Sequence, residues 1–70
     1  MSDWVHILSS AELDAQYALT ASLDPSFARQ QRAFYDSRSD DELRALMHQA
    51  WLCNEACRYQ LARSHLALRA

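Results

Sequence analysis

The sequence predicts an all-α fold in which two short N-terminal helices pack on one long C-terminal helix, spanning about residues 40–69. Three observations lead to this prediction. Ser9 and Ser39 are each followed three residues later by a glutamate, which is the spacing of a helix capping box. Asp24 and Pro25 match the cap and first residue of another helix. Beyond the second capping box the chain contains neither proline nor glycine, so neither of these residues interrupts the last helix.

The first helix is expected over about residues 10–23, where alanine, leucine and tyrosine recur after the Ser9 cap. Ahead of it, residues 1–8 are strongly apolar, and their periodicity fits either a helical turn or an extended strip. A cap at Ser2 would instead begin a longer helix at residue 3. In each case this segment has to be covered by other parts of the protein.

The second helix is expected from Pro25 to about Ser37, followed by a tight link into the last helix. The helix is amphipathic. Its apolar side carries Phe27, Ala28, Phe34 and Tyr35, and its polar side carries Arg29, Gln30, Gln31 and Arg32.

The apolar residues of the last helix fall on two stripes when they are projected at about 100° per residue. The predicted core stripe consists of Leu43, Leu46, Met47, Ala50, Cys53, Cys57, Leu61 and Leu68. The second stripe consists of Trp51, Leu52, Tyr59, Ala62 and Leu66, with Arg58 and Arg63 among or beside them. A helix that packs only within its own domain needs one stripe. Its length of roughly 40 Å would also exceed the roughly 30 Å diameter of a compact chain of this size, so we expect it to project beyond the domain.

The length and charge of the chain limit what kind of protein it is. Seventy residues make one domain, residues 1–70, near the size at which burial barely offsets conformational entropy. A second copy is the simplest further source of stability, so we expect a helical homodimer. The net charge of −2 gives no attraction toward nucleic acid or an anionic membrane. The chain has no apolar run long enough to span a membrane and no signal-peptide pattern, which predicts a cytoplasmic protein.

The residue pattern predicts neither catalysis nor a bound cofactor. Without glycine, the chain cannot form a glycine-dependent phosphate-binding loop. The serines at positions 9 and 10 are explained as cap residues, and the acidic run at positions 40–42 as a helix start. His6, His48 and His65 do not cluster in the sequence and are expected at the surface or an interface.

Cys53 and Cys57 lie one helical turn apart, and we expect both to pack as small buried residues within the core stripe. The alternative is a metal- or redox-responsive dimer, in which two copies bring four thiols around a structural zinc ion.

A DNA-binding regulator is a further alternative, because a short link between the second and third helices resembles a helix-turn-helix. Phosphate contacts would come from Arg44, Arg58, Arg63 and Arg69. However, the third helix begins with three carboxylates, which would meet the phosphates of the major groove. We therefore do not expect nucleic-acid binding.

The second stripe is the predicted binding surface, because tryptophan, tyrosine and arginine are enriched where proteins bind one another. The predicted partner-binding residues are Trp51, Leu52, Tyr59, Leu66, Arg58 and Arg63. Its partner would be a second copy or a larger protein, unless the N-terminal segment covers it within the monomer. The expected function is that of a small, acidic, non-enzymatic regulator or inhibitor from a bacterium or phage. That last step rests on analogy with proteins of similar size and composition.

Overall fold

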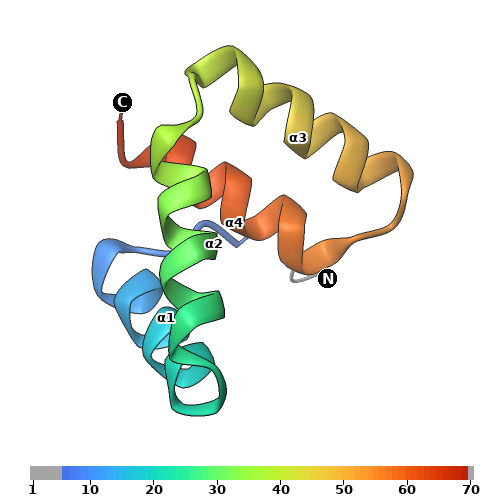
Figure 1. Cartoon of the computed structure of the whole chain (residues 1–70). Helices are drawn as coiled ribbons and strands as arrows, with labels where there is room; N and C mark the ends of the chain where they lie inside the picture. Colours follow the sequence, from blue (N-terminus) through green and yellow to red (C-terminus); the bar gives the residue numbers. More distant parts are fainter. Residues whose placement is uncertain (1–5, 70) are drawn as a thin grey trace.

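The computed structural model describes residues 6–69, and over these residues it contains four helices of similar length and no strand. The helices are α1 (Ser10–Leu23), α2 (Pro25–Ser37), α3 (Asp40–Leu52) and α4 (Ala56–Ala67). They form two helical hairpins, α1–α2 and α3–α4, which meet where α2 packs against α4 (Figure 1). The all-α prediction is confirmed.

The predicted single helix over residues 40–69 is wrong, because the chain turns sharply between α3 and α4. Asn54 adopts a left-handed conformation with φ of 59°. The N–H of Glu55 donates to the carbonyl of Ala50 (2.8 Å), and the N–H of Asn54 donates to that of Trp51 (3.3 Å). These two bonds and the left-handed residue define a Schellman motif, the usual way in which a helix ends. The chain has neither glycine nor proline here, and asparagine occupies the left-handed position that glycine usually takes.

The helix starts predicted from the capping residues are confirmed. Ser9 Oγ accepts from the N–H of Glu12 (3.2 Å), whose carboxylate accepts from the N–H of Ser9 (3.0 Å). The same reciprocal pair of bonds begins α3 at Ser39, and Asp24 caps α2 ahead of its first-turn proline. The alternative cap at Ser2 lies outside the described residues.

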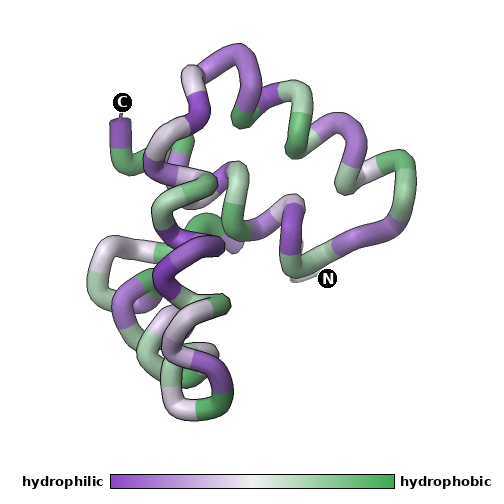
Figure 2. Tube along the Cα trace, in the orientation of Figure 1, coloured by the Kyte–Doolittle hydropathy of each residue, from purple (hydrophilic) through white to green (hydrophobic). Residues whose placement is uncertain are grey.

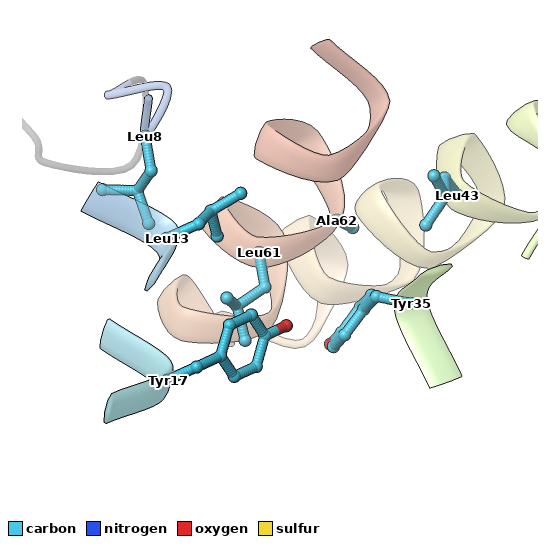
Figure 3. Packing of buried hydrophobic residues seen from close by; sticks show 7 residues of the cluster. All are labelled: Leu8, Leu13, Tyr17, Tyr35, Leu43, Leu61 and Ala62. Atoms are coloured by element: carbon cyan, nitrogen blue, oxygen red, sulfur yellow. The ribbon is translucent and has the colours of Figure 1, made fainter. Parts of the chain in front are cut away.

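The core lies around α4, where this helix packs against α3 and against the α1–α2 hairpin (Figure 3). It consists of Leu8, Leu13, Tyr17, Tyr35, Leu43, Leu61 and Ala62, with Leu46, Met47 and Leu66 packed around it. The N-terminal segment joins it through Leu8, whose N–H donates to Ser64 Oγ on α4 (2.9 Å). Of residues 6–8, Leu8 is buried against α4, whereas Ile7 exposes 43% of its surface. Trp4 and Val5, which were also expected to be covered, lie outside the described residues.

The predicted core stripe is only partly correct. Cys53 and Cys57 are exposed, and Leu68 exposes half of its surface. The break at Asn54 gives α4 a new direction, so a stripe calculated for one straight helix does not continue across it. The predicted projection beyond the domain is wrong for the same reason, since the molecule measures 29 × 29 × 23 Å. None of the described helices is long and apolar enough to cross a bilayer.

Arg69, just after α4, connects three chain segments. Its Nη2 donates to the carbonyls of Tyr35 and Asp36 at the end of α2, both at 3.1 Å. Its Nη1 donates to the carbonyl of Arg38 and to Asp40 Oδ1 at the start of α3 (3.2 Å for the latter). A cation here satisfies carbonyls that a helix end leaves without intrahelical partners. The contact therefore fixes the corner between α2 and α3.

Candidate interaction surface

Three of the predicted partner-binding residues lie together beside the α3–α4 turn: Trp51, Tyr59 and Arg63, here named the turn cluster. The ring centroids of Trp51 and Tyr59 are 5.5 Å apart at an interplanar angle of 51°. The Arg63 guanidinium lies 5.9 Å from the Tyr59 ring centroid, and its Nη1 donates to the Tyr59 hydroxyl (3.2 Å). The cluster therefore joins the last turn of α3 to two turns of α4.

Exposure differs within this surface. Trp51 exposes 56% of its surface and Leu52 exposes 69%, whereas Tyr59 and Arg63 are half-buried. Figure 2 shows the hydrophobic segment at the end of α3, where the chain enters the turn. The Schellman motif fixes the backbone directly after Trp51 and Leu52. These two side chains therefore form an apolar surface at the turn of the α3–α4 hairpin.

The other two predicted residues have different surroundings. Arg58 Nε pairs with Glu55 Oε2 at 3.1 Å, and Arg58 lines a hollow together with Tyr35 and Leu46 on the side of α2. Leu66 is half-buried and packs against the core. The break between α3 and α4 thus divides the predicted stripe, and these two residues lie apart from the turn cluster.

A second apolar surface, outside the predicted binding residues, lies along α2. Phe27 exposes 50% of its surface and Phe34 exposes 43%, although both were predicted on the apolar, inward side of this helix. Ala28 and Tyr35 instead provide its buried contacts. The surface, here named the α2 groove, has a hollow of about 300 Å³ whose lining includes Phe27, Gln30, Gln31, Phe34, Leu46 and Arg58. The seven-residue spacing of Phe27 and Phe34, which places both rings on one face of the helix, is the sequence feature that indicates this surface.

The least expected feature is a buried polar contact around His65, which was predicted near the surface and is only 4% exposed. The Tyr17 hydroxyl lies 2.8 Å from His65 Nε2, and Asp36 Oδ1 lies 3.2 Å from Nδ1. With the proton on Nδ1, the imidazole donates to Asp36 and accepts from Tyr17, so both ring nitrogens are satisfied. The Tyr35 ring stacks on the imidazole at 5.3 Å.

The network of Tyr17, His65 and Asp36 connects the two hairpins and is here named the joint between the hairpins. Burial is the largest influence on the pKa of His65 and lowers it, while Asp36 acts in the opposite direction. Burial raises the pKa of Tyr17, because it disfavours the charged form of this side chain too, and the hydroxyl therefore stays protonated as a donor. The network links α1, α2 and α4. A neutral imidazole with both nitrogens occupied fits a role in holding the two hairpins together.

The cysteines lie at the α3–α4 turn and at the start of α4, and both are exposed free thiols. The prediction that they pack in the core is wrong. Within residues 6–69, no group of three or more histidine, cysteine or acidic side chains is arranged to hold a metal ion. A zinc site shared between two copies stays a prediction.

The arginines are largely paired with carboxylates of the same chain. Among the described residues, ion pairs join Arg32 to Asp14, Arg38 to Glu42, Arg44 to Asp41, Arg58 to Glu55 and Arg69 to Asp40. Phosphate binding relies on arginine and lysine charge that is not already neutralised in this way. This arrangement supplies no observation in favour of DNA binding, which stays an untested alternative.

Comparison of the chain with protein-family models, with curated proteins and with solved structures gave no match.

Proposed function

We propose that this protein is a small, non-enzymatic interaction module that binds a larger protein through the turn cluster and the adjacent Leu52. The observation that carries the proposal is the 56% exposure of Trp51 beside Tyr59 and Arg63. Tryptophan, tyrosine and arginine are the three residue types most enriched among side chains that dominate binding energy at protein interfaces.

The geometry of the turn cluster supports binding with little loss of conformational entropy. Trp51 is in the last helical turn of α3, and its ring lies beside that of Tyr59, which is in turn contacted by Arg63. Rigid aromatic side chains lose less entropy on binding than flexible ones, so more of the contact energy remains as affinity. The exposed Leu52 extends the apolar area at the same turn.

The proposed role is stoichiometric, as a regulator or inhibitor whose effect comes from occupying a surface of its target. Support for this class comes from the small size and acidic charge of the chain. The assignment to bacterial or phage regulation rests on analogy with small proteins of this kind.

Affinity capture from a lysate of the source organism tests the proposal. Wild-type protein is compared with a Trp51→Ala, Tyr59→Ala double variant and with a Leu19→Ala, Leu23→Ala control. The control removes two residues of α1 that are even more exposed, at 72% and 90%. We expect one protein to be captured by the wild type and the control and to be absent with the turn-cluster variant, provided that circular dichroism shows equal helicity.

A photo-crosslinking amino acid placed at position 52 or at position 23 then tests direct contact. Both leucines are highly exposed, but they belong to different hairpins. Crosslinking of the captured protein is expected from position 52 and not from position 23. Undiminished capture by the turn-cluster variant, or crosslinking from position 23 alone, would contradict the proposed surface.

A further inference from the structure

The α2 groove has a feature that the turn cluster lacks, because four of its lining residues are arranged symmetrically along one helix. Phe27 and Phe34 are seven residues apart, so they lie on the same face two turns from one another. Gln30 and Gln31 lie midway between them, and all four residues line the same hollow. Leu46 of α3 contributes an apolar wall to it.

A two-fold axis passing between Gln30 and Gln31 would make this face complementary to itself. In an antiparallel contact of two α2 helices, Phe27 of one copy meets Phe34 of the other, twice, and the glutamines meet at the centre. Glutamine amides carry both donors and acceptors, so they can bond to their own kind without the repulsion that like charges would cause.

The charges at the two ends of the groove also match under this symmetry. The Arg38 guanidinium lies 4.8 Å from the Phe34 ring centroid, which places it on this face near the end of α2. Asp24 caps the start of α2 and is exposed. The antiparallel contact brings the arginine of one copy toward the aspartate of the other. Arg38 is 3.6 Å from Glu42, so the new contact would extend an existing ion pair.

We propose that α2 associates with α2 of a second copy about a two-fold axis between Gln30 and Gln31, with the phenylalanines pairing across the interface. The proposal uses a different surface from the turn cluster and is independent of its target. A buried phenylalanine covers about 200 Å², so the exposed halves of the two rings supply only a fraction of the roughly 800 Å² per partner in a standard interface. The dimer is therefore weak and depends on protein concentration.

The decisive experiment places a charge beside the two-fold axis. Gln30 is exposed, so Gln30→Glu and Gln30→Lys leave the core unchanged. In each variant alone, like charges from the two copies lie near one another, and sedimentation velocity should show monomers where the wild type shows dimers. Mixing the two variants pairs opposite charges and should restore the dimer. Only an interface that brings position 30 of one copy near position 30 of the other gives this pattern.

Ala15→Glu and Ala15→Lys are the matched controls, since Ala15 is an exposed position on α1. Both should dimerise as the wild type does. The proposal is overturned if the wild type is monomeric at all concentrations, if both Gln30 variants dimerise normally, or if their mixture stays monomeric. Dissociation of the Ala15 variants to the same extent would overturn it too, because the effect would then be one of charge in general.

Discussion

The turns of the two hairpins depend on different residues, and this difference explains why only the α1–α2 turn could be predicted from the sequence. Between α1 and α2 a single residue, Asp24, is followed by Pro25, whose fixed φ and missing N–H interrupt the first helix and suit the first turn of the next one. Between α3 and α4 the chain relies on Asn54 in a left-handed conformation. Asparagine tolerates that conformation without requiring it. A proline determines a break locally, whereas this asparagine ends a helix only because the rest of the fold favours it.

The hairpins also contribute differently to the core. The first supplies two buried tyrosines, Tyr17 and Tyr35, while α4 of the second supplies a buried serine and histidine, Ser64 and His65. The hydrogen bond between His65 and Tyr17, and the ring contacts of His65 with both tyrosines, connect the two hairpins. Polar groups that are satisfied in only one arrangement fix the relative position of the hairpins more specifically than apolar packing does.

The largest expected effect comes from Leu61, which lies between the hairpins and is 2% exposed. Leu61→Ala should lower the free energy of unfolding by about 2–5 kcal/mol, because it leaves a cavity where both hairpins pack. Urea denaturation followed by circular dichroism measures the change. Leu52→Ala is the control, since that side chain is 69% exposed and should change stability by less than about 0.5 kcal/mol. Equal losses in the two variants would mean that Leu61 does not join the hairpins.

A smaller effect is expected from Arg69, whose guanidinium closes the corner between α2 and α3. Arg69→Ala removes a cation from several carbonyls and a carboxylate, and should cost about 1–2 kcal/mol after allowance for its partial exposure. Arg44→Ala is the comparison, because its pair with Asp41 is exposed and is worth about 0.5 kcal/mol or less. Equal thermal midpoints for the two variants would show that the corner does not depend on Arg69.

Asn54 tests the turn of the second hairpin directly. Asn54→Ala places a side chain that disfavours the left-handed region at φ of 59°, and should destabilise the protein by about 1 kcal/mol. Asn54→Gly should be neutral or stabilising in the same denaturation measurement, because glycine adopts this conformation readily. If alanine were tolerated as well as glycine, the Schellman motif would not be what ends α3.

Those parts of the fold that depend on neighbouring residues could be predicted from the sequence. The capping boxes at Ser9 and Ser39 and the break at Pro25 each involve residues within a single helical turn, and all three are confirmed. The position of α4 could not be predicted in this way, because it depends on a turn that Asn54 permits rather than dictates. Because α4 does not continue the axis of α3, the predicted face of each residue after Asn54 does not apply to α4.

The candidate surface shows the same limit. Trp51, Tyr59 and Arg63 were predicted to share a face and they do, because the turn brings α4 back beside the end of α3. This agreement does not arise from the predicted geometry of one straight helix. His65 was missed because its partners Tyr17 and Asp36 are 48 and 29 residues away, and no local pattern indicates contacts of that kind.

The smallest expected effect is a dependence of stability on pH that arises at the joint between the hairpins. Burial lowers the pKa of His65 in the folded protein, Asp36 on α2 raises it, and Arg32 and Arg69 add to the lowering. The unfolded chain has the ordinary pKa near 6.5. As the pH falls through this value, the unfolded state binds a proton that the folded state binds less readily, so stability decreases. Because Asp36 opposes burial, the decrease should be modest.

Thermal unfolding at about pH 7.5 and 5.5, on either side of the ordinary histidine pKa, measures this dependence. His65→Gln is the comparison, since a glutamine amide can donate to Asp36 and accept from Tyr17 without titrating. Between about pH 7.5 and 5.5 the thermal midpoint of the wild type should decrease more than that of the variant. A larger loss in the variant would mean that His65 is protonated in the folded state, so that its pairing with Asp36 outweighs its burial. The joint would then be an ion pair, in contrast to the neutral hydrogen-bonded chain from Tyr17 through His65 to Asp36.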